Sequence, residues 1–276
     1  MSWLLLGSGV SMFWKRFASA VVFGVLVILI VRSGLWIFFA TVSVVVVLSV
    51  YEFSRLASGG LLLGFLNIAI AWLICLSSFR PDWVDVNVVI CLAIGLPFLL
   101  EIIRRDPSSA LLNTSSALLG ILYAGWLFGR HLILLRQMEH GRNLIFLLVG
   151  ITWSGDIGAY LVGMRFGKHK FIPAISPGKS LEGYIAGIAF SCVTALAIRY
   201  WLLTGIGLLH ILILGAGLTV IGQVGDLAES LLKRGAKVKD SGSLMPGHGG
   251  VLDRCDSMIF ITPALYYYSA YILHIN

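Results

Sequence analysis

The sequence predicts an all-α polytopic membrane protein, and two observations support this fold class. Hydrophobic residues make up 58% of the 276 residues, charged residues make up only 12%, and the mean hydropathy is +0.94, whereas an ordinary soluble domain carries about 25% charged residues. In addition, the apolar stretches reach about 20 residues without the alternation of β-strands, which is the length of a membrane helix. This pattern excludes a cytosolic enzyme, a disordered protein and a secreted disulfide scaffold.

We expect about nine transmembrane helices. The first apolar stretch follows Lys15 and Arg16 and resembles the apolar region of a signal peptide, but no convincing cleavage site follows it, so we interpret it as a membrane helix. The fourth stretch is interrupted by Gly95 and Pro97, and the fifth is mildly polar. The predicted spans are residues 17–31, 34–51, 61–79, 83–103, 110–128, 143–163, 182–203, 208–231 and 257–275.

The basic residues predict the orientation of these spans. The net charge is +7, but Lys and Arg lie in short connections between apolar stretches, which indicates membrane orientation rather than nucleic-acid binding. With the N-terminus in the cytoplasm, 14 Lys and Arg residues fall on the inner side and 6 on the outer side, which together make up the 20. If the inner connections also bind substrate, part of this bias is functional.

Acidic residues gather in the second half of the chain. Seven of the 13 Asp and Glu residues fall at or after residue 156, and in the predicted topology each lies at or near the inner end of a span or in an inner connection. We therefore divide the chain into an N-terminal transmembrane scaffold, residues 1–140, and a C-terminal catalytic transmembrane region, residues 141–276. The seven acids are Asp156, Glu182, Asp226, Glu229, Asp240, Asp253 and Asp256.

The four cysteines carry no chemistry in this interpretation. Cys75, Cys91, Cys192 and Cys255 form no CxxC pair, and three of them lie inside apolar stretches. We expect small buried hydrophobic residues rather than a disulfide framework or a zinc site.

Two pairs of carboxylates stand at the ends of the last two predicted spans. Asp226 and Glu229 share one helix face with Lys233, because their spacing is i, i+3 and i+7, and Asp253 and Asp256 repeat the i, i+3 spacing. A carboxylate in mid-membrane costs roughly 2.5–3.5 kcal/mol, and four would repel one another unless a metal or paired bases neutralise them. Hard oxygen ligands favour Mg²⁺, which takes phosphate oxygens as further ligands. The alternative is an Asp/Glu–Lys pair at the membrane edge.

The connection between these two pairs is rich in glycine and basic residues. Glycine lets backbone N–H groups approach an anion, and lysine adds charge for phosphate. Flanked by carboxylates, such a connection is typical of a metal and polyphosphate site, although a flexible cytoplasmic connection also explains it. His248 alone is more often a hydrogen-bonding loop residue than a catalyst. The glycine and basic residues are Gly235, Lys237, Lys239, Gly242, Gly247, His248, Gly249 and Gly250.

Asp156 is a further candidate, because it lies inside the predicted span 143–163, between Trp153 and Tyr160. A carboxylate inside a membrane segment is a functional candidate by default. The alternative is a structural pair with an arginine of a neighbouring helix.

The segment 176–183 places a lysine before a predicted helix. Gly178, Lys179 and Ser180 are similar to the end of a P-loop, but that motif requires glycine where Pro173 stands, and no strand precedes it, so we exclude a P-loop. Ser180 is expected to cap the following helix, and Lys179 then lies at a helix N-terminus, where an anion is favoured. An ordinary basic loop with a capped helix start is the alternative.

A long motif runs through the second half of the chain. It reads Ser230-x-Leu232-Lys233-Arg234-x4-Lys239-Asp240-x-Gly242-x3-Pro246-Gly247-His248-Gly249-Gly250-x2-Asp253-Arg254-x-Asp256. This run closely resembles the phosphatidate cytidylyltransferase (CDP-diacylglycerol synthase) family, and the segments around Asp156 and Lys179 resemble family motifs in the expected order. The resemblance is strong over residues 150–260. Met245, Cys255 and Gly178 depart from the family pattern, and only Gly178 puts a contact in doubt.

The resemblance implies that CTP and phosphatidate react to give CDP-diacylglycerol and pyrophosphate. It implies Mg²⁺ as cofactor, with a second cation left open, and a homodimer. We expect an integral protein of the bacterial inner (cytoplasmic) membrane, with the N-terminus in the cytoplasm and the active site at the cytoplasmic face of the C-terminal half. No nucleic acid is expected as a partner.

Three groups of site residues follow from the motif and the charge pattern together. The predicted catalytic residues are Asp226, Asp253, Asp256, Lys239 and His248. The predicted substrate-binding residues are Ser176, Lys179, Lys233, Arg234, Gly249, Gly250 and Arg254. The predicted metal ligands are Asp226, Asp253, Asp256, Asp156 and Glu229.

Two other functions remain open at this point. An ion-coupled transporter also uses carboxylates near interrupted helices, but it would not explain a basic, glycine-rich connection flanked by acids. A CTP-dependent lipid kinase would release CDP, whereas a cytidylyltransferase would release pyrophosphate.

Overall fold

The computed structural model describes residues 22–57, 60–244 and 249–275, and these residues form helices and connections without a β-strand. The first helix is Val22–Arg32, and the beginning of the predicted span 17–31 lies outside the described residues. α5 (Pro107–Gly120), the π-helix η1 (Ile121–Arg130) and α6 (His131–Gln137) follow one another as one continuous rod. The other helices are α2 (Leu35–Leu56), α3 (Leu61–Phe79), α4 (Val86–Arg104), α7 (Gly141–Phe166), α8 (Leu181–Leu202), α9 (Leu208–Gly235) and α10 (Leu252–Tyr271).

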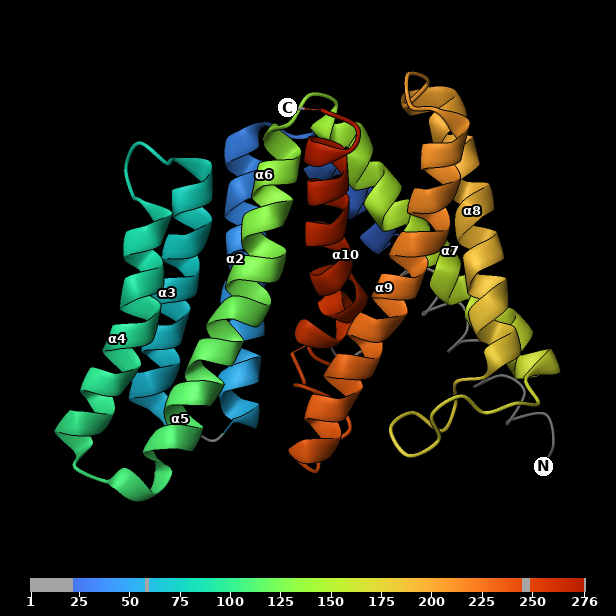
Figure 1. Cartoon of the computed structure of the whole chain (residues 1–276). Helices are drawn as coiled ribbons and strands as arrows, with labels where there is room; N and C mark the ends of the chain where they lie inside the picture. Colours follow the sequence, from blue (N-terminus) through green and yellow to red (C-terminus); the bar gives the residue numbers. More distant parts are fainter. Residues whose placement is uncertain (1–21, 58–59, 245–248, 276) are drawn as a thin grey trace, which may run out of the picture.

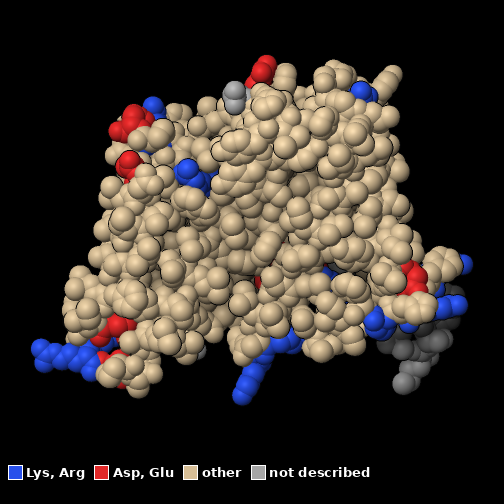
Figure 2. Space-filling model, in the orientation of Figure 1, with Lys and Arg blue, Asp and Glu red and all other residues tan. Residues whose placement is uncertain are grey.

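Seven rods of the described chain are long and apolar enough to cross a membrane, namely α2, α3, α4, the rod α5–η1–α6, α7, α8 and α9. α10 has 20 residues and carries charged residues in its first turns, and it is not one of these seven. In Figure 2, charged side chains gather at the upper and lower ends of the visible face, whereas the middle band is almost free of them. The predicted all-α polytopic membrane protein is therefore confirmed.

The rod α5–η1–α6 differs from the predicted span 110–128, because it continues over 31 residues. Arg130 and Arg136, which fall in the connection between the predicted spans 110–128 and 143–163, lie in this rod. Arg130 lies over the ring of Trp126 at 4.7 Å, and the buried Arg136 donates a hydrogen bond of 2.9 Å to the carbonyl oxygen of Ser33. Partners of this kind keep arginine inside a helix bundle, and hydropathy along the sequence does not register them.

The helices form two groups joined by α10 (Figure 1). α7, α8 and α9 pack against one another, α2, α3, α4 and the rod α5–η1–α6 form the second group, and α10 contacts both. α7 and α8 approach backbone to backbone, since a Cβ at Gly187 would lie 2.9 Å from the carbonyl oxygen of Gly155.

The four cysteines are free thiols, as expected, but they are not all buried. Cys75 and Cys255 are buried, Cys192 is half-buried and Cys91 is exposed. The prediction of burial is wrong for Cys91, because α4 lies at the edge of the bundle and turns much of its surface outward (Figure 1).

One end of the bundle gathers the segments that carry the predicted motifs. The end of α7, the start of α8, the end of α9 and the start of α10 all lie at the lower side of Figure 1, together with the connection 167–180. The end of α2 reaches the same side, whereas the C-terminus lies at the upper side. The fold therefore brings segments that are distant in sequence to one face.

Candidate active site

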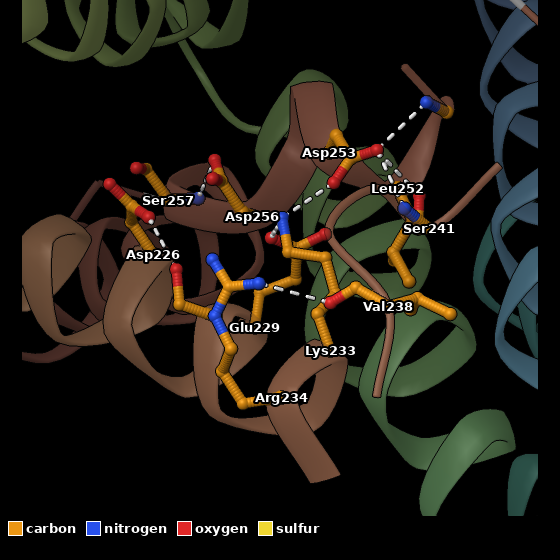
Figure 3. A network of polar contacts seen from close by, with 12 residues as sticks. Asp226, Glu229, Lys233, Arg234, Val238, Ser241, Leu252, Asp253, Asp256 and Ser257 are labelled. Atoms are coloured by element: carbon orange, nitrogen blue, oxygen red, sulfur yellow. Dashed lines mark hydrogen bonds and ion pairs between the residues drawn. The ribbon is translucent and has the colours of Figure 1, made fainter. Parts of the chain in front are cut away.

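A lysine bridges two buried acids where α9 meets α10. Lys233 Nζ lies 2.5 Å from Glu229 Oε2 and 2.6 Å from Asp253 Oδ1 (Figure 3). The acid side chains are only 1% and 7% exposed, so the lysine charge is needed to offset two poorly solvated carboxylates. The acid–lysine pair that the sequence left open therefore exists, but it is buried between two helices.

Asp253 also holds the connection that precedes α10. Its Oδ2 accepts hydrogen bonds from the backbone N–H groups of Ser241 at 2.9 Å and Gly250 at 2.8 Å, and from the Ser241 hydroxyl at 2.9 Å. Burial alone would raise the pKa of Asp253, but the hydrogen bonds from Lys233 and the two backbone N–H groups outweigh burial and lower the pKa to about 2. Asp253 is therefore a carboxylate whose two oxygens already have partners in the protein.

Three further carboxylates come from three different helices. Asp156 belongs to α7, Asp226 to α9 and Asp256 to α10, and the negative charge of Asp226 acts on the other two. The carboxylates of Asp226 and Asp256 face the same space in Figure 3. Lys179 Nζ lies 2.6 Å from Asp226 Oδ2, and Asp256 accepts a hydrogen bond of 2.6 Å from the Ser257 N–H. Carboxylates this close repel one another, so the arrangement favours a cation in the space that they share.

Asp156 is influenced by cations of two other segments. The positive charges of Lys179 and Arg254 act on it, while Asp226 repels it. Asp156 itself is exposed on the surface of the bundle. The charges that act on it include both cations and another acid, as either of the two alternatives from the sequence would require.

These carboxylates fit a divalent cation that is shared with a phosphate. Carboxylate oxygens are the hard ligands that Mg²⁺ prefers. Among the described residues, no three His, Cys, Asp or Glu side chains are arranged to hold a metal ion by themselves. Mg²⁺ is usually bound through one or two carboxylates plus substrate phosphates, not in a cage made by the protein alone. The donor set therefore fits Mg²⁺ bound together with a polyphosphate.

The predicted phosphate-binding cations lie at the same end in different environments. Lys179 pairs with Asp226, and Arg234 donates a hydrogen bond of 3.1 Å to the carbonyl oxygen of Val238. Lys239 and Arg254 are exposed. Arg234 is exposed as well, so three of these four cations lie at the surface of this end of the bundle.

Described glycines of the glycine-rich connection lie directly against carboxylates of the protein itself. Gly249 has a φ of 81°, which favours glycine, and a Cβ there would lie 2.7 Å from Asp253 Oδ2. The N–H of Gly250, which we expected to bind substrate, donates to Asp253. The predicted catalytic residue His248 lies outside the described residues.

The connection before α8 has the predicted capping geometry. The Ser180 hydroxyl accepts a hydrogen bond of 3.2 Å from the N–H of Gly183, which confirms Ser180 as the cap. The carbonyl oxygen of Ser176 accepts a hydrogen bond of 3.3 Å from the N–H of Lys179. This turn brings Lys179 beside the N-terminus of α8.

Sequence reasoning missed Glu52, which α2 brings to the start of α10. Glu52 is 1% exposed and accepts hydrogen bonds from the N–H groups of Val251 at 3.0 Å and Leu252 at 2.8 Å. The predicted span 34–51 ends one residue before Glu52, which lies in the predicted scaffold and belongs to none of the predicted motifs. The one available signal was an acid directly after an apolar stretch.

Tyr123 of η1 was missed as well. It is buried, and its hydroxyl has no hydrogen-bond partner among the described residues. The charges that act on it are those of Glu229, Asp256 and Asp226. No local pattern in the sequence connects a tyrosine of the first half with these acids.

A bundle of apolar helices with acids and cations gathered at one end defines an integral membrane protein with a polar site at one face. The chain belongs to the cytidylyltransferase family, whose sequence model matches residues 14–272. It is 34% identical over 208 residues to the phosphatidate cytidylyltransferase of Bacillus subtilis (strain 168), covering 74% of this chain and 77% of that protein. It is 35% identical over 202 residues to the phosphatidate cytidylyltransferase of Staphylococcus aureus (strain COL), covering 70% and 74%.

The protein of the same name from Staphylococcus saprophyticus is 34% identical over 194 residues, again covering 70% of this chain and 74% of the relative. The family that the sequence motif indicated is therefore confirmed, and with it the class of enzyme, a nucleotidyltransferase.

Proposed function

We propose that this protein transfers the cytidylyl group of CTP to phosphatidate, which gives CDP-diacylglycerol and pyrophosphate. The observation that supports this most is the convergence of carboxylates from α7, α9 and α10 beside Lys179, in a chain that belongs to the cytidylyltransferase family. The similar proteins of Bacillus subtilis and Staphylococcus aureus are phosphatidate cytidylyltransferases.

The proposed reaction is an in-line displacement. An oxygen of the phosphatidate phosphate attacks the α-phosphorus of CTP, and the bond from that phosphorus to the bridging oxygen breaks, so pyrophosphate leaves with the bridging oxygen. A phosphate monoester has its second pKa near about 6 and is mostly a dianion at neutral pH, so a strong general base is not required. Two anionic substrates must instead be brought together, which makes catalysis a matter of positioning and electrostatics.

Two sets of residues divide this task in our proposal. Asp226, Asp256 and Asp156 would hold Mg²⁺, which supplies positive charge against the phosphate oxygens. Asp253 and Glu229, also predicted as metal ligands, hold Lys233 and the connection before α10 through their contacts. The cations proposed to bind phosphate oxygens are Lys179, Arg234, Lys239 and Arg254, and Ser176, His248, Gly249 and Gly250 are proposed to shape the pocket around them.

The substrates also suggest the orientation. CTP is a cytosolic nucleotide, and the head group of phosphatidate lies at the membrane interface. We therefore propose that the lower end of Figure 1 faces the cytoplasmic side of a bacterial inner membrane. A cytoplasmic N-terminus remains a prediction from the distribution of basic residues. The homodimer and a second cation remain predictions of the family resemblance.

A product assay with the purified protein tests the proposed function. Radiolabelled CTP and phosphatidate in mixed micelles should give labelled CDP-diacylglycerol and pyrophosphate with Mg²⁺, and no product in excess chelator. Release of CDP instead of pyrophosphate would identify a lipid kinase. Proteoliposomes that accumulate an ion or solute without CTP consumption would identify a transporter.

A further inference from the structure

We infer that Glu52 is a positioning residue of the reaction, because it fixes the start of α10 and thereby the place of Asp253 and Asp256. This inference rests on the proposed function. Glu52 belongs to the half of the chain that the sequence assigns to the scaffold, and about 200 residues separate it from the amides that it binds.

The first argument is that Glu52 replaces a missing helix cap. The residue at the N-cap of α10 is Val251, which makes no side-chain cap. The first N–H groups of a helix have no partner within the helix, and here Glu52 Oε1 accepts from Val251 and Oε2 from Leu252. A carboxylate at this position is also favoured by the dipole of α10. The first turn of α10 therefore forms against an acid from α2.

The second argument is that the connection before α10 is shaped around this carboxylate. A Cβ at Gly242 would lie 2.5 Å from Glu52 Oε1, and a Cβ at Gly250 would collide with Oε2. Neither position can carry a side chain unless Glu52 moves. The sequence suggests that these two glycines bind the phosphate of a ligand. In the structure, the absence of their side chains leaves room for the Glu52 carboxylate.

The third argument is a direct link from Glu52 to the site. The Ser241 hydroxyl lies 3.1 Å from Glu52 Oε2 and 2.9 Å from Asp253 Oδ2. Asp253 in turn contacts Lys233. A shift of Glu52 would therefore be transmitted to Asp253 through one hydroxyl and to Asp256 through the first turn of α10.

Glu52→Gln and Glu52→Ala test this inference, with Glu101→Gln as the matched control. Glu101 is a buried acid of α4 in the same predicted scaffold, and it pairs with Arg104 at 2.7 Å. Loss of a partner that orients a metal-binding side chain typically costs about 10- to 100-fold in metal affinity or activity. We expect Glu52→Gln to raise the Mg²⁺ concentration for half-maximal rate, or to lower kcat, by this factor, while the KM for phosphatidate stays within about twofold.

Amide hydrogen exchange of the segment 249–256, measured in detergent without nucleotide, gives a readout that does not depend on catalysis. Exchange should become about tenfold faster in Glu52→Ala, because two amides lose their acceptor, and should stay unchanged in Glu101→Gln. Normal exchange in Glu52→Ala, or faster exchange with wild-type kcat and Mg²⁺ dependence in Glu52→Gln, would overturn the inference. If Glu52→Ala does not fold, Glu52→Gln replaces it in the exchange measurement with the same expected direction, because the side-chain NH₂ of Gln cannot accept a hydrogen bond from a backbone N–H. A wild-type protein that releases no pyrophosphate would instead refute the proposed function.

Discussion

Two groups of carboxylates lie at the same end of this bundle, and they are held in opposite ways. Glu52, Glu229 and Asp253 are enclosed. Backbone N–H groups, a hydroxyl or Lys233 contact the oxygens of this group, except Glu229 Oε1, which has no hydrogen-bond partner among the described residues. Asp226 and Asp256 act on each other as like charges, and the side chain of Asp226 is 30% exposed. We call Glu52, Glu229 and Asp253 the enclosed group and Asp226 and Asp256 the open group. The enclosed group holds α2, α9 and α10 together, and the open group is the one that we propose to bind a cation.

The largest effect is expected from the open group. Replacing Asp226 or Asp256 with Asn keeps the shape but removes the charge that would hold a cation, so the rate of CDP-diacylglycerol formation should fall by about 10²–10³ or more. The midpoint of thermal unfolding in detergent should change little, because the repulsion that is removed offsets the ion pair that Asp226 loses with Lys179. Near-normal rates across a Mg²⁺ titration would show that these acids are not the ligands.

Lys233→Met should have the largest effect on stability. It leaves Glu229 and Asp253 buried without their cation, and breaking a buried pair from one side costs about 3–5 kcal/mol. Thermal unfolding or denaturant titration of the purified variant measures this. The triple variant Glu229→Gln, Lys233→Met, Asp253→Asn should recover part of the lost free energy of unfolding. If Lys233→Met alone unfolds at the wild-type midpoint, the enclosed carboxylates do not depend on Lys233 and do not differ from the open ones in this way.

Lys179→Met should affect CTP binding more than stability. Its partner Asp226 is partly exposed, so the lost ion pair should change the free energy of unfolding by less than about 1 kcal/mol. The KM for CTP should rise about tenfold, because a phosphate-binding cation is gone. A variant that unfolds easily but binds CTP normally would place Lys179 in the structural group instead.

The smallest effect is expected from Ser180→Ala. Loss of this cap should lower the stability of α8 by about 1 kcal/mol, and it should loosen the turn that presents Lys179. The KM for CTP should increase two- to threefold, in the same direction as Lys179→Met. If Lys179→Met raises the KM for CTP and Ser180→Ala leaves it unchanged, the turn at Ser180 does not position Lys179.

The fold could be predicted from the sequence because the length of an apolar stretch directly reflects the thickness of the bilayer. The two largest departures have one cause. The rod of Arg130 and Arg136 continues further than predicted, and α10 begins at Leu252 rather than at residue 257. In both places, partners distant in sequence satisfy charged or unpaired groups: Ser78 for Arg130, Ser33 for Arg136 and Glu52 for the start of α10. Hydropathy measures the cost of a polar group but not the partner that offsets it.

The candidate site could be predicted in composition but not in arrangement. The cost of an acid in or beside an apolar segment singled out Asp156, Asp226, Glu229, Asp253 and Asp256, but it did not separate Glu229 and Asp253, which pair with Lys233, from the other three. The pairing of Lys233 with Glu229 follows from helical spacing, whereas its contact with Asp253 depends on how α10 meets α9. Glu52 and Tyr123 belong to elements of the first half, and only the folded chain brings them near these acids.

Backbone donors at the described ends of the glycine-rich connection are already occupied, and this limits what the motif can do outside its protein. In a P-loop, free backbone N–H groups receive the phosphate, so that segment works as a portable module. Here the N–H groups of Gly250, Val251 and Leu252 face carboxylates, and one of those carboxylates arrives from α2. A synthetic peptide of residues 236–256, or the same stretch transplanted into another bundle, would carry the signature by which the family is recognised and still fail to take up its shape.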